Sequence, residues 1–337
     1  MTDWGDVAAR ARGLASQLLA PAQARALCDA SDLAALMSAL AAAGWPLATR
    51  VERSADPRAI EFAVRRRAGA RLRVLARWAR ERAALLSPLF DDEDRRSLRA
   101  IVRGAMAGIP AEERVRGVIP TPSLPLRALE QLSRTHDVAS IASLLTVWRH
   151  PCARGVATEA RRPHPDLFHI EVAIARTFAE RGLAAARKAG PPMRLFVERT
   201  IDLENLWTAL MLSAAPGDVA AADLFVPGGR VITLADLETA ARLKSIPAFT
   251  SIIRPRVAGT PLAAALEPGE RSAEDRSLDA LCAEFRRVAL RNPLSSAPVI
   301  LFVLRQRRET RTLLHLVWGI ALGAPRHAIE TAIGAAA

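Results

Sequence analysis

The run Asp91-Asp92-Glu93-Asp94 is the first group in this 337-residue chain whose residue types and spacing suggest chemistry. Carboxylates one helical turn apart face the same side of a helix and can hold Mg²⁺, which in turn can bind a diphosphate. Such a site also needs an acidic fifth residue and a second acidic cluster, but the fifth position is Arg95 and no second run occurs. We therefore interpret the run as charge in the early turns of a helix, where the helix dipole favours acids.

Other patterns for catalysis or metal binding are missing. A phosphate-binding loop needs Gly-Lys followed by Ser or Thr at a helix start, and neither Lys188 nor Lys244 follows a glycine. The Gly-x-Ser-x-Gly pattern of serine hydrolases does not occur. His164 and His169 lie five residues apart, whereas two ligands on one helical face need a spacing of three or four. We expect no catalytic residue, no cofactor, no metal and no small-molecule substrate.

The cysteines and the apolar runs bear on the compartment. Cys28, Cys152 and Cys282 are odd in number and far apart, so they suit neither a disulfide framework nor a zinc site and fit a reducing environment. The N-terminal residues do not have the basic-then-apolar order of a signal peptide. The longest nearly uncharged runs fall short of the ~20 residues needed to span a bilayer. We expect a cytoplasmic protein without a transmembrane segment.

The chain is strongly basic, with a formal net charge of +12. The charge is densest in 58–82, where nine arginines face only Glu61 and Glu81. This strip is either a solvated face or a contact for an acidic partner, such as a protein or anionic lipid headgroups. Nucleic acid would use the same charge, but aromatic interleaving and zinc-finger or RNP motifs are missing, so it is not expected. Our candidate contact residues are Arg65, Arg66, Arg67, Arg71 and Arg77.

The elements that must position these residues are helices. Aromatic residues make up only 4% of the chain and Tyr is absent, so Ala and Leu, both strong helix formers, must do most of the packing. Short β-branched runs bounded by turns do not recur, which argues against a sheet. We predict a helical hairpin of residues 4–20 and 22–43, and a helix from an Asp56 N-cap to about Leu86.

Three later segments share one pattern, in which a proline opens a long helix that closes at a glycine. They are residues 87–108, 191–217 and 298–323. Leu206 follows Leu98 by 108 positions, and Leu313 follows Leu206 by 107. A second long helix precedes the pattern at about 166–188 and again at 274–291, and Pro227-Gly228 suits a type II turn. The period is too long for a solenoid of helix pairs, so we predict three copies of a small helical domain.

The ordered motifs resemble those of the C subunit of archaeal and bacterial V/A-type rotary ATPases, called the d subunit in the eukaryotic vacuolar enzyme. The matching stretches are Ala9–Leu14, Ile201–Leu206, Leu224–Gly229 and Glu309–Leu313, and the resemblance covers essentially the whole chain. The residues that mark the repeat are Leu98, Asp202, Asn205, Leu206 and Leu313.

This chain departs from the family's pattern in two respects. Members of the family are usually rich in Tyr, which this chain lacks. The Asp-x-x-Asn-Leu pattern is kept only in the middle copy, at Asp202, Asn205 and Leu206; the first copy ends in Arg96-Ser97-Leu98 and the third in Arg311-Thr312-Leu313. The chain is therefore similar to a divergent member of the family.

The resemblance implies an all-α, funnel-shaped body of three pseudo-threefold-related repeats. We place the repeats at residues 1–155, 156–260 and 261–337, the last completed by the N-terminal helices. It also implies a non-catalytic rotor subunit, peripheral on the cytoplasmic face of the membrane. Such a subunit would connect the central-shaft subunits to the proteolipid ring during ATP-linked proton or sodium transport. The alternatives are a basic helical adaptor for another acidic partner or nucleic acid, and an α-helical isoprenoid-type enzyme.

Overall fold

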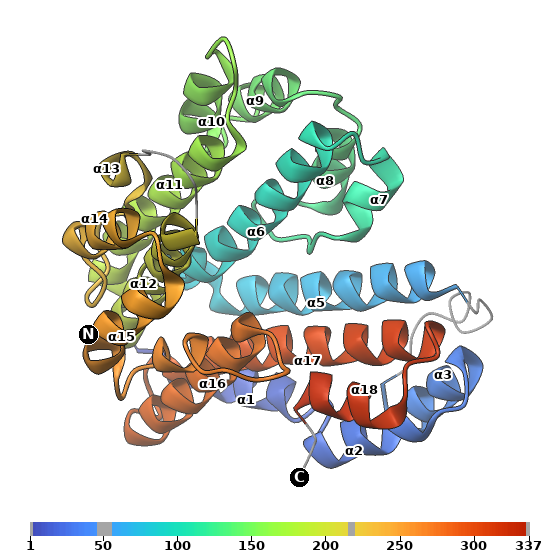
Figure 1. Cartoon of the computed structure of the whole chain (residues 1–337). Helices are drawn as coiled ribbons and strands as arrows, with labels where there is room; N and C mark the ends of the chain where they lie inside the picture. The colour runs from blue at the N-terminus through green and yellow to red at the C-terminus, as the bar shows by residue number, and fades with distance from the viewer. Residues whose placement is uncertain (1–2, 46–55, 215–219, 335–337) are drawn as a thin grey trace.

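The computed structural model describes residues 3–45, 56–214 and 220–334, and every regular element within these ranges is a helix. Figure 1 shows the elements arranged in chain order around the molecule. Helices α6–α10 lie at the top, α11–α15 on the left, and α16–α18 at the bottom with the N-terminal α1–α3. The all-α prediction is confirmed for the part of the chain that the structure describes.

Six long helices form the framework. They are α5 (Pro57–Ala79), α6 (Ser87–Met106), α11 (Leu167–Ala189), α12 (Pro191–Ala214), α16 (Ala273–Arg291) and α17 (Ala297–Ala321). Their limits follow from local chemistry that the sequence displays. Asp56 caps α5 by accepting a hydrogen bond from Arg58 N at 3.0 Å, and Asp166 caps α11 through His169 N at 3.1 Å. Proline occupies the first turn of α5, α6 and α17, where its missing N–H is not needed.

Shorter helices fill the spaces between the long ones. Those before α11 are α1 (Gly5–Ala15), α2 (Pro21–Ala26), α3 (Leu33–Ala42), α7 (Ala111–Arg116), α8 (Leu126–Ser133), α9 (Val138–Val147) and α10 (Ala153–Ala160). Those after α12 are α13 (Ala221–Leu224), α14 (Leu234–Leu243), α15 (Ile246–Val257) and α18 (Arg326–Ile333). Helix α1 packs against α17 although the two lie at opposite ends of the sequence.

Two predicted helices are interrupted. The helix predicted for 22–43 breaks after a 3₁₀ turn at Leu27–Asp29, because Asp32 accepts a hydrogen bond from Ala35 N and begins a new helix. The helix predicted to reach Leu86 ends at Ala79, since Arg80 adopts a φ of 51°. A 3₁₀ segment, Arg80–Leu86, then carries Leu86 into the core.

The buried apolar side chains in the described ranges form three clusters. The largest joins α1, α5, α11, α12, α14–α16 and the start of α17. A second joins the C-terminal half of α6 to α8–α10. The third joins the C-terminal half of α17 and α18 to the N-terminal residues 27–45 and the start of α5. Within residues 3–45, 56–214 and 220–334, none of the helices has the length and apolar character to cross a membrane.

Candidate functional site at the junction of three long helices

The three helices that share the repeat pattern, α6, α12 and α17, each carry a buried carboxylate at the same place. Asp94, Asp202 and Glu309 each lie four residues before the leucine that marks the repeat. Their exposed fractions are 2%, 0% and 6%. A buried carboxylate is stable only when hydrogen bonds or positive charges satisfy it. The hydrogen-bond and ion-pair partners of each carboxylate therefore show which segment of the chain it fixes to its helix.

Asp202 holds the turn that follows α12. One of its oxygens, Oδ1, accepts hydrogen bonds from Arg230 N at 2.9 Å, Val231 N at 2.8 Å and Ile232 N at 3.1 Å. The approach needs glycine at Gly229, because a Cβ there would overlap that oxygen. Gly228 has a φ of 104°, so the predicted positive φ in this turn is confirmed.

Asn205 holds the same loop one turn farther along α12. Its side-chain Nδ2 donates to Val226 O at 2.8 Å, and its Oδ1 accepts from Val226 N at 2.9 Å. The pair satisfies both backbone groups of a buried residue. Asp202 and Asn205 therefore fix the loop between α13 and α14 against the middle of α12.

Asp94 makes the corresponding contacts after α6. Its two oxygens accept hydrogen bonds from the hydroxyls of Thr121 and Ser123. Ser97 occupies the place of Asn205 and donates to Ile119 O at 3.4 Å. The loop is also pressed against α5, where a Cβ at Gly69 would lie 2.6 Å from Pro120 O.

Glu309 on α17 binds the N-terminal part of the chain. Its Oε1 accepts from Leu19 N at 2.8 Å and from Trp45 Nε1 at 2.9 Å, and Oε2 is paired with Arg71. Arg71 also donates to Gln17 O at 3.1 Å. The third carboxylate therefore ties α17 to the segment after α1 and, through Arg71, to α5.

The equivalence of the three acids was missed by the motif comparison, which found the Asp-x-x-Asn-Leu pattern only in the middle copy. The repeat spacing does show the equivalence of the three acids. Asp94 lies 108 positions before Asp202, and Glu309 lies 107 positions after it. The pattern is broken in the other two copies, because Ser97 stands in place of Asn in the first copy, and Glu309 and Thr312 stand in place of Asp and Asn in the third. Asp94 keeps the residue type and Glu309 replaces Asp by Glu, so all three copies have a carboxylate at the buried position.

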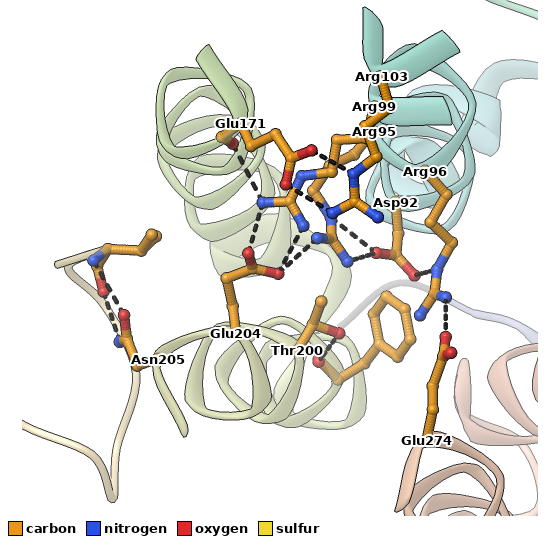
Figure 2. A network of polar contacts seen from close by, with 12 residues as sticks. Asp92, Arg95, Arg96, Arg99, Arg103, Glu171, Thr200, Glu204, Asn205 and Glu274 are labelled. Carbon is orange, nitrogen blue, oxygen red and sulfur yellow. Dashed lines mark hydrogen bonds and ion pairs between the residues drawn. The ribbon is translucent and has the colours of Figure 1, made fainter. Parts of the chain in front are cut away.

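A network of ion pairs joins the same three helices, and Figure 2 shows the part of it on α6, α11, α12 and α16. Asp92 on α6 is fully buried and pairs with Arg95 at 2.7 Å, with Arg96 at 3.5 Å and with Arg307 on α17 at 2.8 Å. Arg95 in turn reaches Glu204 on α12 at 2.7 Å. Helix α6 is thus connected to α17 through Asp92 and to α12 through Arg95.

The network extends to α11 and α16. Glu204 also binds Arg99, with an Nη1 distance of 2.9 Å, and the Arg99 guanidinium donates to Glu171 O at 3.0 Å. Arg103 pairs with the Glu171 carboxylate, and Arg96 reaches Glu274 on α16 at 3.2 Å. Figure 2 shows these side chains converging from several helices on one interior region.

The electrostatics of the junction favour charged carboxylates at its centre. Burial alone would raise the pKa of Asp92, but Arg307, Arg96 and Arg95 together hold this pKa below its usual range. Burial likewise opposes the ionised form of Glu204, but Arg99 and Arg95 lower its pKa to about 2. The partners of Asp94 among the described residues are hydroxyl groups, and burial raises its pKa to about 7.

The acidic run of α6 is not explained by the helix dipole, and that interpretation is wrong. The first turn of α6 contains no acid, because the helix begins at Ser87. The four side chains are instead held by partners within the fold: Asp91 pairs with Arg181 at 3.2 Å and Glu93 with Arg307 at 3.1 Å, beside Asp92 and Asp94 described above. In the part of the chain that the structure describes, no His, Cys, Asp and Glu group could hold a metal ion.

The five candidate contact residues of the basic strip lie on α5 in different surroundings. Arg71 is buried with Glu309, Arg65 pairs with Glu61 at 2.8 Å, and Arg67 stacks 4.4 Å from the ring centre of Trp45. Arg66 and Arg77 are exposed. These two lie eleven positions apart and so share one helical face. Their contact with an acidic partner stays a prediction.

Comparison with known proteins identifies the family. A family model described as "ATP synthase (C/AC39) subunit" matches residues 7–332. The C subunit of the A-type ATP synthase of Haloferax volcanii is 25% identical over 279 residues, which cover 80% of each chain. The C subunit of the V-type ATP synthase of Thermus thermophilus is 27% identical over 239 residues, or 70% of each chain. The chain therefore belongs to the C/AC39 subunit family of ATP synthases and is a subunit of a V/A-type rotary ATPase.

Proposed function

We propose that this chain is a non-catalytic rotor subunit that connects the central-shaft subunits of a V/A-type ATPase to the proteolipid ring in the membrane. The observation that carries the proposal is the family match over 7–332, together with relatives named as the C subunits of A-type and V-type ATP synthases. In this role the chain is peripheral on the cytoplasmic face and corresponds to the d subunit of the eukaryotic vacuolar enzyme. The transported ion is H⁺ or Na⁺.

The proposed body is a funnel of three repeats about a pseudo-threefold axis, with boundaries near residues 155 and 260. The buried acids support this arrangement, because Asp94 and Asp202 each bind a loop about 28 residues farther along the chain. Glu309 instead accepts a hydrogen bond from Leu19 N, in the segment after α1. The apolar cluster that joins 313–329 to 27–45 supports completion of the third repeat by the N-terminal helices.

The mechanical role assigned to the junction is to keep α6, α12 and α17 from sliding against one another under torque. Asp92 holds Arg307, and Arg95 holds Glu204, so relative movement of the three helices would separate buried charges. Removing one partner of such a buried pair costs about 3–5 kcal/mol. A body stiffened in this way can pass rotation from the shaft to the ring without doing chemistry itself.

The proposal is tested by assembling the catalytic head, the shaft subunits and the ring in vesicles with and without this chain. We expect ATP hydrolysis by the head to continue in its absence, while ATP-driven ion uptake is lost. Adding the purified chain back should restore uptake. Ion uptake that is the same with and without the chain would contradict the coupling role.

Anionic lipid headgroups are a further proposed partner, through the exposed arginines of α5, Arg66 and Arg77. Each basic residue close to an anionic leaflet contributes about 1 kcal/mol to binding. Sedimentation with vesicles of increasing phosphatidylserine content tests this proposal, and binding that does not depend on that content would contradict it.

A further inference from the structure

Two adjoining cavities lie along α16 and α17, on the side that faces α1 and α2. Their volumes are about 1180 and 500 Å³. Arg286, Leu301 and Arg305 line both, so the two cavities form one continuous depression, which we name the α16–α17 groove. Glu309 is the one member of the buried acids that lines it, and the residues of the ion-pair network described above lie outside its lining.

The groove has an apolar end and a length suited to a helix. Its apolar lining includes Phe302, Pro298 and Leu301 on α17 and Leu290 on α16, and Leu290 is 74% exposed. Lining residues follow α17 from Pro298 to Thr312. At 1.5 Å per residue these positions span about 21 Å, the length of a helix of roughly 14 residues.

The other end of the groove is basic. Six arginines but only three acids line the larger cavity. The acids are engaged within the fold: Asp29 with Arg326, Asp279 with Arg271, and Glu309 with Arg71. Three exposed arginines have no carboxylate partner among the residues that the structure describes: Arg286, Arg287 and Arg305.

We propose that the α16–α17 groove is a docking site for an acidic amphipathic helix of another subunit of the rotary ATPase. Apolar side chains at i, i+3 and i+4 of that helix would cover Leu290 and Leu301, as helices do in hydrophobic grooves. Carboxylates on its flank would meet Arg286, Arg287 and Arg305, since guanidinium groups bind carboxylates in two-point contacts. The inference rests on the proposed function for its partner and adds the place and chemistry of the contact.

A protein helix fits this groove better than nucleic acid does. Single-stranded nucleic acid needs exposed aromatic rings on which its bases can stack. Phe302 is the aromatic residue that lines the groove, and only 1% of its surface is exposed. The exposed apolar surface of the groove belongs to aliphatic side chains, which suit the Leu or Ile face of a helix.

Site-specific crosslinking in the assembled complex tests the contact directly. A photoreactive benzoylphenylalanine replaces Leu290 in one sample and the exposed Arg154 on α10 in a control sample. We expect position 290 to crosslink to one subunit, at a segment that is net acidic and apolar at helical spacing. An assembled complex without crosslinks from 290, or with crosslinks only to lipid or to a basic segment, would overturn the inference. Failure of the wild-type chain to assemble would contradict the proposed function instead.

Charge reversal gives a second measurement. Arg286→Glu, Arg287→Glu and Arg305→Glu in one chain should weaken its affinity for the purified subunit that crosslinks to position 290 about 10- to 100-fold, from about three exposed pairs. The loss should shrink as NaCl is raised, because exposed charges are screened. The control reverses three exposed arginines outside the groove: Arg134, Arg154 and Arg187. Equal loss in both triple variants would overturn the groove as the contact.

Discussion

Replacing Asp202 is the sharpest test of the role given to the buried acids. Asp202→Ala removes the oxygen that accepts three backbone hydrogen bonds, from Arg230, Val231 and Ile232. A buried donor that loses its acceptor costs about 1–3 kcal/mol. Arg230 lies at the surface, where water can replace the lost acceptor, so we expect a loss of about 3–5 kcal/mol in the free energy of unfolding, mainly from the other two donors.

Asp202→Asn is the matched comparison because it keeps an acceptor oxygen at the same place. Burial raises the pKa of Asp202, so the fold does not strongly favour its charged form. We therefore expect Asp202→Asn to lower the free energy of unfolding by only about 1–2 kcal/mol, because its neutral amide oxygen accepts weaker hydrogen bonds. Asp223→Ala, at an exposed acid on α13, controls for removal of charge and should change stability by no more than about 0.5 kcal/mol.

Urea unfolding followed by circular dichroism at 222 nm measures these differences. Hydrogen exchange supplies a local measurement, in which the amides of 230–232 should exchange faster in the Ala variant than in the Asn variant. Equal stability of the Ala variant and the Asp223→Ala control would refute the claim that Asp202 holds the loop. Unchanged exchange at 230–232 would refute it independently.

Three further perturbations have defined outcomes. Because the pKa of Asp94 is raised to about 7, ionisation of Asp94 should lower the free energy of unfolding as pH rises from about 4 to 7. The free energy of unfolding of Asp94→Asn relative to wild type should therefore increase by a few kcal/mol across that range. Parallel pH profiles of the two proteins in urea unfolding would contradict this. Glu309→Gln should lower the free energy of unfolding by about 3–5 kcal/mol, because it leaves Arg71 buried without its carboxylate. Adding Arg71→Met should recover part of this loss in the same unfolding assay. Fully additive effects of the two substitutions would argue against the pair. Arg66→Glu with Arg77→Glu should leave helicity unchanged and weaken assembly with acidic partners in pull-downs; unchanged assembly would remove α5 as a contact.

The limits of the long helices could be predicted because they are encoded locally. Asp56 and Asp166 act as N-caps in the structure, and Pro227-Gly228 forms the expected turn. The break at Arg80 was not predictable in this way. Arg80 has a positive φ, which residues other than glycine rarely adopt. The neighbouring residues include neither the glycine nor the proline that usually marks the end of a helix.

The chemistry of the junction was only partly visible in the sequence. The acidic run was visible in the sequence, but two explanations predict the same run at the same place: charges that interact with the helix dipole, and carboxylates that form ion pairs within the fold. The choice depends on Arg307, which lies more than 200 positions from Asp92 in the sequence. The basic strip shows the same limit, since the pairing of Arg71 with Glu309 depends on how α5 and α17 pack.

The most direct test of a coupling role is to recover the affinity-tagged chain from gently solubilised native membranes and weigh the intact complexes by native mass spectrometry. We predict one complex in which this chain is bound to the shaft subunits and to the proteolipid ring together. After the shaft is dissociated, a smaller complex of the chain with the ring should remain. Recovery of the chain with neither assembly, or with the catalytic head alone, would contradict a place between shaft and ring.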